Sequence, residues 1–565
     1  GSSAFRYTNF IGELIIPNTV TTIGSNSFQS LKFSGSLTIP DSVLEIGQLC
    51  FAQCDNFKGT LTLSNNLTTI AQHSFLGCTG FTGTLVIPDS VIEIEMNAFD
   101  SCENFTDLKL SNNLQSIGNS AFSKCINLQN TLKLPDSLYE IGESAFVDCN
   151  RLSGDLIIPP KITVISSTAF RGCSGISGSL VLPEGLTEIS IYSFYQCSKI
   201  SGELKIPESV TNIADFAFSY CSGFSGTLVI PTKITTVNSY VFSSCSGLDG
   251  NLILHDKIES ILENAFSYCS KLSGSLVIPD SVKEIKVSSF QDCMGFDGTL
   301  TLSSSMKFVD NFCFSGCYRF SGSLIIPDSV TQIESHAFYR CFGFDGSLKL
   351  SNILTNINDN AFFMCYGFKG DLNITSKVMD IRERAFENCY GFDGSLIISP
   401  SLNVIHNSTF SGCSGFKGSL ILPDRIKEIC GSAFKGCFGF DGNLVLSNTL
   451  MYISDFAFAS CTGFKGELII PSTIKKIYEN AFLNCSGFSG SLKIPSSLDS
   501  IKFGTFSGCN GMNGDLYIYA NLTSIEDNAF SSTHFNNVFY FGVKEPVCDS
   551  KIGFISDQTV YVTDD

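Results

Sequence analysis

Tryptophan is absent from this chain of 565 residues, histidine occurs only 5 times, and charged residues make up only 16% of the composition. No apolar stretch approaches the length of about 18 residues that a membrane-spanning helix requires, and Leu14–Ile16, for example, ends at Pro17. Acidic residues (53) outnumber basic ones (35), and no Lys/Arg cluster occurs that would neutralise phosphates. We therefore expect neither membrane insertion by this segment nor nucleic-acid binding.

Patterns that carry catalysis or metal binding are equally scarce. The histidines lie far apart in the sequence, and the cysteines do not form the close pairs of a zinc site. Pro-Asp-Ser turns, as at Asp280, lack the several oxygens within one loop that calcium requires, and the Asp is instead expected to cap its own turn. We predict no enzyme, no catalytic residue, no cofactor and no metal.

What the chain does contain is a repeat. Cysteines recur every 24 residues, with one 23-residue step between Cys102 and Cys125, and a Phe stands three residues before each of these cysteines. The Phe position is filled at 22 repeats, from Phe28 to Phe530. Such a period indicates one quasi-linear array rather than several globular domains.

Each repeat contains a Leu-x-Ile or Leu-x-Leu segment that alternates with period two, as in 276–278, and reads as a short strand. No repeat holds an amphipathic helix. One repeat therefore forms one coil, whose apolar side chains are buried only when coils stack. We predict a β-rich, right-handed solenoid of 22 coils of about 24 residues, closed by a C-terminal strand cap.

The fixed apolar positions are predicted to point inward and to form ladders from coil to coil. The Phe fills the centre of each coil, the Cys fills a tight corner, and a second apolar pair such as Val282 and Ile285 forms the wall opposite the strand. Cysteines stacked about 4.8 Å apart with parallel Cβ vectors do not suit disulfide geometry, so we predict free, buried thiols that can bond a backbone carbonyl. Cys548 lies outside this ladder and is expected to be exposed or paired within the cap. Central ladder residues are Phe290, Phe314, Phe338, Cys293, Cys317 and Cys341.

Two repeats depart from the pattern of one Gly before each strand. Asn130 replaces the Gly in one repeat, and Asn is the non-Gly residue that best tolerates a left-handed backbone. The other departure is a deletion between Phe105 and Leu108, which accounts for the 23-residue step. We infer that this Gly forms a bulge or turn that can be removed without shifting the inward positions.

The repeat resembles a known family. Segment 324–333, Leu-Ile-Ile-Pro-Asp-Ser-Val-Thr-Gln-Ile, followed by Ala337, Phe338 and Cys341, is similar to the leucine-rich repeats of BspA-like proteins from mucosal bacteria and parasitic protists. Segment 539–562, which contains Phe-Tyr-Phe-Gly and Val-Tyr-Val, resembles the strand-rich end of the protist members. The resemblance covers residues 10 to 562. It implies a leucine-rich-repeat solenoid with an extracellular adhesion or recognition role, and it brings no catalytic residues.

These observations predict three segments. Residues 1–11 comprise a cloning remnant and an N-terminal cap, since the opening Gly1-Ser2-Ser3 is typical of such a remnant. Residues 12–533 form the leucine-rich-repeat solenoid, and residues 534–565 form the C-terminal cap segment.

Recognition by a solenoid depends on its outward positions, because the inward ones are committed to packing. One candidate surface is the strip formed by the middle residue of each strand segment, which is apolar in most coils and Lys in several, and which includes Ile325, Lys349 and Ile397. A contiguous exposed apolar strip usually marks an interaction surface, whereas β-branched residues also suit a pleated surface without any partner. Both interpretations remain open for the strip.

A second candidate surface follows the ladder cysteines, where most coils have Ser or Thr but one block has aromatic residues. Rings on adjacent coils would stack about 5 Å apart, and arginines nearby add a residue type that is enriched at interface hot spots. The alternative is an aromatic ladder that packs on itself to cover the turn. The residues are Tyr318, Phe342, Tyr366, Tyr390 and Phe438, with Arg319 and Arg340 beside them.

The resemblance and these surfaces together predict a cell-surface or secreted protein. It would bind host-cell, extracellular-matrix or microbial ligands, either protein or carbohydrate, through the face of the solenoid. A structural role is the alternative, in which copies of the chain associate along the apolar strip to form a coat or to aggregate cells.

Overall fold

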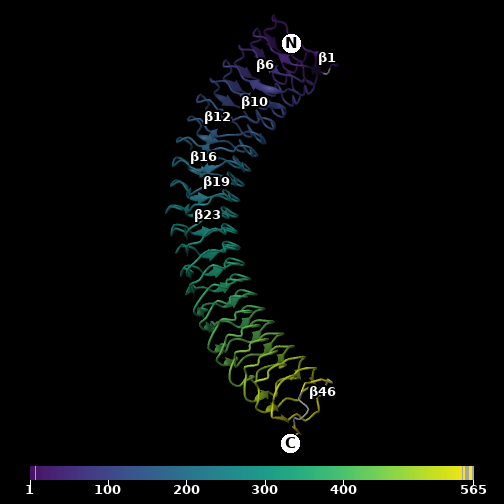
Figure 1. The fold of residues 1–565 in the computed structure, drawn as a ribbon, viewed down its shortest axis with the longest axis vertical. Helices are drawn as coiled ribbons and strands as arrows, with labels where there is room; N and C mark the ends of the chain where they lie inside the picture. The colour runs from purple at the N-terminus through teal and green to yellow at the C-terminus, as the bar shows by residue number, and fades with distance from the viewer. Residues whose placement is uncertain (7, 550, 554–558, 563–565) are drawn as a thin grey trace. The chain divides into compact units, whose positions relative to one another are not determined.

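The computed structural model describes residues 1–6, 8–549, 551–553 and 559–562. Over these residues the protein is a parallel β-solenoid of about 23 turns that contains no helix, which confirms the predicted fold class. The chain divides into two compact units, residues 1–273 with 293–295 (unit 1) and residues 274–292 with 296–565 (unit 2). Figure 1 shows the successive coils of each unit, coloured from purple at the N-terminus to yellow at the C-terminus.

Unit 1 has two rows of short strands, one in or just before the Leu-x-Ile segment and one at the opposite wall. The first row comprises β1 (Ile11–Glu13), β3 (Lys32–Ser34), β4 (Leu37–Thr38), β6 (Leu61–Thr62), β8 (Gly83–Val86), β10 (Phe105–Lys109), β13 (Leu156–Ile157), β15 (Leu180–Val181), β17 (Gly202–Glu203), β19 (Phe224–Ser225), β20 (Leu228–Val229) and β22 (Leu252–Ile253). The second row comprises β2 (Thr22–Ile23), β5 (Glu45–Ile46), β7 (Thr69–Ile70), β9 (Glu93–Ile94), β11 (Ser116–Ile117), β12 (Glu140–Ile141), β14 (Val164–Ile165), β16 (Glu188–Ile189), β18 (Asn212–Ile213), β21 (Thr236–Val237) and β23 (Ser260–Ile261).

Unit 2 repeats the same two rows. Its first row comprises β24 (Leu276–Val277), β26 (Leu300–Thr301), β28 (Leu324–Ile325), β30 (Leu348–Lys349), β32 (Leu372–Asn373), β34 (Leu396–Ile397), β36 (Leu420–Ile421), β38 (Leu444–Val445), β41 (Leu492–Ile494), β43 (Leu516–Ile518), β45 (Asn537–Tyr540) and β47 (Thr559–Val562). Its second row comprises β25 (Glu284–Ile285), β27 (Phe308–Val309), β29 (Gln332–Ile333), β31 (Asn356–Ile357), β33 (Asp380–Ile381), β35 (Val404–Ile405), β37 (Glu428–Ile429), β39 (Tyr452–Ile453), β40 (Lys476–Ile477), β42 (Ser500–Ile501), β44 (Ser524–Ile525) and β46 (Val547–Cys548).

Strands pair in parallel with their counterparts in the adjacent coil. In the first row of unit 2, Leu324 pairs with Leu348 and Ile325 with Lys349, so that residues at the same repeat position meet. Because side chains alternate along a strand, Leu324 and Leu348 are buried whereas Ile325 and Lys349 face solvent. The predicted inward and outward positions of the strand are therefore confirmed.

The core of each unit is a column of stacked phenylalanine rings. In unit 2 the ring of Phe338 lies 5.5 Å from that of Phe314 and 5.3 Å from that of Phe362, and the planes are within 8° of parallel. These rings are completely buried, and so is the opposite wall, for example Val330 and Ile333. The Phe ladder predicted from the period is thus confirmed. In unit 1 the column begins at Phe5, whose ring lies 5.5 Å from that of Phe28, one position before the first that the period identifies.

The ladder cysteines occupy the corner of the coil as buried thiols. The Sγ–H of Cys341 donates to the carbonyl oxygen of Phe314 in the preceding coil at 3.1 Å, and that of Cys317 donates to Phe290 at the same distance. Cys293 does the same in unit 1, where its Sγ lies 3.0 Å from the carbonyl of Phe266. The prediction of free, buried thiols bonded to a backbone carbonyl is confirmed, and Cys548 is free and exposed.

The turn around each ladder Phe has a backbone that the sequence does not predict. His336 and Arg340, two residues before and two residues after Phe338, have φ angles of 60° and 61° in the left-handed region. The amides of His336, Phe338 and Arg340 all donate to carbonyls of the next coil, whereas the amides between them bond within the turn. These hydrogen bonds offset the cost of the unfavourable φ angles, because every backbone N–H group of this turn has an acceptor.

Along the first row of unit 2, coils are joined in pairs. β28 pairs with β30, β32 with β34 and β36 with β38, but over the described strands no pairing joins β30 to β32 or β34 to β36. Other bonds follow the same pairing, since the Asn352 amide donates to Asp328 Oδ1 at 2.9 Å and the Gly322 amide donates to Asp345 Oδ1 at 2.7 Å. The second row runs continuously through β27, β29, β31 and β33. From β24 to β38 the repeating element of this row is thus two coils rather than one, whereas β41, β43, β45 and β47 pair consecutively.

The prediction that the Asp of a Pro-Asp-Ser turn caps its own turn is wrong. The Oδ1 atom of Asp280 accepts a hydrogen bond from the amide of Ser304 in the next coil, at 2.8 Å. This bond lowers the pKa of Asp280, and the Asn352 amide lowers that of Asp328 in the same way. The physical reason is that each turn lies directly against the next one, so the nearest free amide belongs to the neighbouring coil.

Candidate functional site

Two positions of each turn point away from the core and form rows along the units. We call the residue two positions after the ladder Phe the shoulder position, and the residue directly after the ladder Cys the corner position. The shoulder residue is held by its own amide, which in Arg340 donates to the carbonyl of Phe363 in the next coil at 2.8 Å. The shoulder row therefore has a hydrogen-bonded backbone, and both rows carry side chains that lie outside the core.

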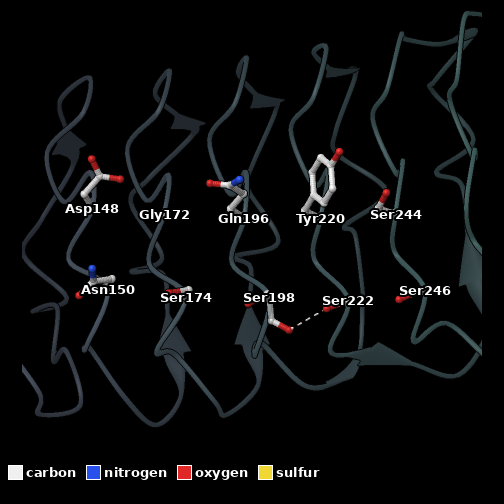
Figure 2. Close-up of a pocket in the computed structure, with 10 residues that line it drawn as sticks. All are labelled: Asp148, Asn150, Gly172, Ser174, Gln196, Ser198, Tyr220, Ser222, Ser244 and Ser246. Atoms are coloured by element: carbon white, nitrogen blue, oxygen red, sulfur yellow. Dashed lines mark hydrogen bonds between the residues drawn. The ribbon is translucent and has the colours of Figure 1, made fainter.

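In unit 1 these two rows border a shallow groove of about 530 Å³ across five coils. Figure 2 shows the two rows side by side, and the hydroxyl of Ser222 donates to the carbonyl oxygen of Ser198 at 3.2 Å. The groove is lined by hydroxyl and amide groups, one carboxylate and one phenol. The shoulder residues are Asp148, Gly172, Gln196, Tyr220 and Ser244, and the corner residues are Asn150, Ser174, Ser198, Ser222 and Ser246.

In unit 2 the corner row carries the predicted aromatic block. Ring centroids are 5.1 Å apart for Tyr318 and Phe342, 4.7 Å for Phe342 and Tyr366, and 4.9 Å for Tyr366 and Tyr390. We call these four residues the aromatic column. The stacking distance predicted from the coil spacing is confirmed. The first three rings are half-buried and Tyr390 is exposed, so the column covers the turn and also presents its ring edges to solvent.

Arg340 lies beside the aromatic column at the shoulder position. Its guanidinium carbon is 5.6 Å from the ring centre of Tyr318 and 5.4 Å from that of Phe342, within the range of a cation–π interaction. Arg340 forms no ion pair among the residues that the structure describes, although burial raises the pKa of Asp292 and the charge of Arg340 lowers it. An exposed positive charge is thus held against the rings in a chain whose net charge is −18.

The remaining predicted residues are only partly brought together. Arg319, which follows Tyr318 on the same turn, is exposed, and its guanidinium lies 3.6 Å from the Asp297 carboxylate. Phe438 is also exposed, but Ser414 occupies the corner position between it and Tyr390, and no ring contact of Phe438 is found among the described residues. Ile325, Lys349 and Ile397 are exposed on β28, β30 and β34, on the strands rather than on the turn that carries the column.

Sequence reasoning missed a second aromatic cluster in unit 2. The ring of Phe312 stacks on His336 at 4.5 Å and Tyr339 stacks on Phe363 at 5.1 Å, while the Arg384 guanidinium lies 4.7 Å from the Phe363 ring. Phe312 and His336 occupy the position two residues before the ladder Phe. An aromatic bias at that position was visible in the sequence at the 24-residue period.

The same position carries an aromatic stack in unit 1, which was also missed. The rings of Tyr192 and Phe216 are 4.7 Å apart, and those of Phe216 and Tyr240 are 4.5 Å apart. Tyr195 meets the edge of this stack, with its ring centre 5.2 Å from that of Tyr192. Each unit thus has its own cluster of aromatic side chains on the turn.

The half-buried position of His336 predicts a pH-dependent stability. Burial lowers the pKa of His336, the Asp359 carboxylate raises it and the Arg384 guanidinium lowers it further. The unfolded chain therefore takes up this proton first, so that stability is lost as pH falls from about 6.5, the unfolded value, towards the lower folded-state pKa. We expect the loss of unfolding free energy caused by His336→Gln to be smaller at pH 5 than at neutral pH, as measured by urea denaturation. An equal or larger loss at pH 5 would contradict this assignment.

The described residues contain no group of three or more His, Cys, Asp or Glu side chains that could hold a metal ion. Burial raises the pKa of the ladder thiols, to about 12 for Cys149, Cys197 and Cys461. A thiol with such a pKa is a poor nucleophile at neutral pH.

The repeat pattern agrees with that of a described family over most of the chain. The BspA type leucine rich repeat region matches in 6 copies, at residues 1–84, 82–201, 175–297, 273–393, 345–442 and 427–544. The chain belongs to the BspA-type leucine-rich-repeat family. Members of this family are of the surface and adhesion type, and repeat proteins of this fold are generally not enzymes but mediate binding to proteins.

Solved bacterial structures show similarity to this BspA-type chain. A leucine-rich repeat protein from Bacteroides ovatus is 21% identical, with a TM-score of 0.42, over 75% of this chain and 87% of that protein. A leucine rich cell surface protein from Faecalibacterium prausnitzii is 19% identical, with a TM-score of 0.27, over 81% and 87% of the two chains. The pneumococcal vaccine antigen PcpA is 15% identical, with a TM-score of 0.33, over 69% and 84%. No curated protein matches the sequence.

A search of the described residues for a helix long and apolar enough to span a bilayer finds none in this BspA-type chain.

Proposed function

We propose that this protein is a surface-displayed or secreted recognition protein that binds a protein ligand of host-cell, extracellular-matrix or microbial origin. The family assignment supports the surface and adhesion role. The observation that carries the proposal is the aromatic column of unit 2, Tyr318, Phe342, Tyr366 and Tyr390, with Arg340 held against it.

The arrangement of the rings favours a protein over a carbohydrate as the ligand of the column. The faces of the rings already stack on one another at 4.7–5.1 Å, so a sugar ring has no free face between them. Ring edges and phenol hydroxyls remain available, together with the Arg340 guanidinium. Aromatic residues and Arg are the types that contribute most at protein interfaces, and they suit a partner with apolar side chains and an acidic group.

Binding of the purified chain to immobilised collagen, laminin and fibronectin, and to intact epithelial cells, tests the proposal. Tyr366→Ala and Arg340→Ala are each expected to weaken the binding that is observed by about tenfold or more, because hot-spot side chains cost at least 1 to 2 kcal/mol when truncated. Tyr139→Ala is the matched control, since Tyr139 is 54% exposed but lies outside the column in unit 1. Unchanged binding by both column variants would reject the column as the site.

Self-association along the apolar strip is the second candidate function. Ile325 and Ile397 are 56% and 49% exposed, so the strip presents apolar side chains to solvent. Sedimentation velocity over a wide concentration range distinguishes the two functions. A sedimentation coefficient that increases with protein concentration, and that stays at the monomer value in Ile325→Lys, supports self-association. A monomer at every concentration supports recognition of another molecule.

A further inference from the structure

The hollow beside the short coil of unit 1 departs from the repeat and has no part in the function proposed above. It occupies about 810 Å³, more than the groove between the shoulder and corner rows, and is lined by residues of four consecutive coils around β8 and β10. Its lining includes Val86, Asp107, Lys109, Asn130 and Lys133. In a protein built from near-identical coils, a site of this shape at one place requires a local cause.

The coil that contains Phe105 carries the deletion and borders this hollow. β10 is the longest strand, and its pairing with β8 shifts register between Phe105 and Asp107, while Leu85 and Leu108 remain partners and inward. The prediction that the deletion leaves the inward positions in register is therefore confirmed. Over the described strands β10 pairs with β8 alone, and the isolated bridge of the next coil joins Thr131 to Ser153 rather than to β10. The free edge of β10 faces that coil, and the hollow lies there.

Asn130 stands at the edge of the hollow in the position that Gly occupies in other coils. Its Nδ2 atom donates to the carbonyl oxygen of Leu108 at 3.0 Å and takes the place of a ladder bond. Its Oδ1 atom is buried and has no hydrogen-bond partner among the described residues. A buried acceptor without a partner costs roughly 1–3 kcal/mol, and a ligand hydroxyl recovers this cost once the Asn130 amide turns its oxygen toward the hollow.

Lys109 and Lys133 occupy the strip position on adjacent coils, and they are the only consecutive lysines of the strip. Both are exposed, and neither has an ion pair within the described part of the chain. Like charges on neighbouring strands repel and are destabilising, so a bridging anion would stabilise the pair.

No ion pair joins the carboxylates of the hollow to these ammonium groups among the described residues. Asp89 Oδ1 accepts a hydrogen bond from the Asn112 amide at 2.8 Å. Asp107 accepts from the Leu108 amide at 2.9 Å and from the Thr84 hydroxyl at 3.3 Å. Both carboxylates are thus held by the chain itself, and their remaining lone pairs can accept further hydrogen bonds from hydroxyl groups.

We propose that this hollow binds a carboxylate-bearing sugar. The carboxylate of such a sugar bridges Lys109 and Lys133, one of its hydroxyl groups donates to Asn130 Oδ1, and its C–H face lies on Val86. A simple inorganic anion satisfies only the lysines, and a neutral sugar satisfies only the acceptors. The combination of an ammonium pair, a buried acceptor and an apolar surface is met by a sugar acid.

Saturation-transfer NMR and calorimetry with free glucuronic acid and N-acetylneuraminic acid test the proposal on the whole chain. At least one of the two is expected to bind at least about tenfold more tightly than glucose, and Lys109→Gln and Lys133→Gln are each expected to weaken that binding by about tenfold. Asn130→Gly, which restores the residue of the other repeats, is expected to weaken binding while the melting temperature is retained. Lys205→Gln is the matched control, since Lys205 lies on the same strip but pairs with Glu203 at 3.3 Å.

Four results would overturn the proposal. In the first two, neither sugar acid binds better than glucose, or the three hollow variants bind as the wild type does. In the third, inorganic sulfate competes as well as the sugar acids and binds as tightly, which would reduce the hollow to a plain anion site. In the fourth, an acidic peptide binds at the hollow while neither sugar acid binds, which would assign the hollow to a protein ligand.

Discussion

Replacement of Phe338 by Ala is expected to lower the free energy of unfolding of the chain by about 3 to 5 kcal/mol. The Phe338 ring is completely buried, and it stacks on Phe314 at 5.5 Å and on Phe362 at 5.3 Å. The substitution therefore removes ring contacts with both neighbouring coils and leaves a cavity that the rigid hydrogen-bonded turns cannot close. Urea denaturation followed by circular dichroism measures the change.

Phe308→Ala is the matched control for this experiment, because Phe308 lies in β27 of the same unit and is 50% exposed. Its loss is expected to change the free energy of unfolding by less than about 1 kcal/mol. Similar losses for the two variants would mean that the Phe column does not form the core.

Thiol labelling of the native protein is expected to modify Cys548 first and Cys430 slowly, and to leave the buried cysteines unmodified until the protein unfolds. Cys548 is exposed, and Cys430 is half-buried. Burial, with a contribution from Glu428, raises the pKa of Cys430 to about 11. For ladder cysteines whose pKa is about 12, such as Cys149, the thiolate fraction falls roughly a thousandfold below that of a thiol with a pKa of 9.

Mass analysis after labelling with and without denaturant gives the number of modified cysteines in each state. The denatured chain is expected to react at all 24 cysteines. A ladder that is already oxidised under nonreducing conditions, or one that reacts fully in the native state, would contradict the structure. Cys548→Ser is the control, and it removes the fast phase without affecting the protected set.

The inward half of the structure was predictable because packing constrains it at every coil. The 24-residue spacing of residues such as Phe338 and Cys341 is enough to identify one coil, its centre and its corner, and the alternation around Ile325 identifies the exposed strand face. The spacing of the aromatic column also followed, because parallel coils place equivalent side chains about 4.8 Å apart. These are consequences of period and sterics, which the sequence displays directly.

The features that were not predicted depend on contacts between coils. Left-handed backbone at His336 and Arg340 has no signal in residue type, since the hydrogen bonds to the next coil make it favourable rather than the side chains. The pairing of coils did have a signal, because Pro327-Asp328 in one coil alternates with Ser351-Asn352 in the next. It was missed because each coil was treated as equivalent.

The surfaces could be located from the sequence but their ligands could not. Outward residues such as Lys133 are not fixed by packing in the core, so the pattern shows where variation is allowed and not what it recognises. The hollow at the short coil needed the structure, because a deletion and one Asn in place of Gly do not by themselves indicate an open strand edge.

Residue-resolved hydrogen exchange in unit 2 tests most directly whether adjacent coils are joined by hydrogen bonds through a buried core. The amides of Phe314, Phe338 and Phe362 donate to carbonyls of the following coil at 2.8–2.9 Å, from the completely buried centre. We expect these amides to exchange orders of magnitude more slowly than that of Asp328, which lies in an exposed turn. Exchange of the Phe amides as fast as that of Asp328 would contradict the account.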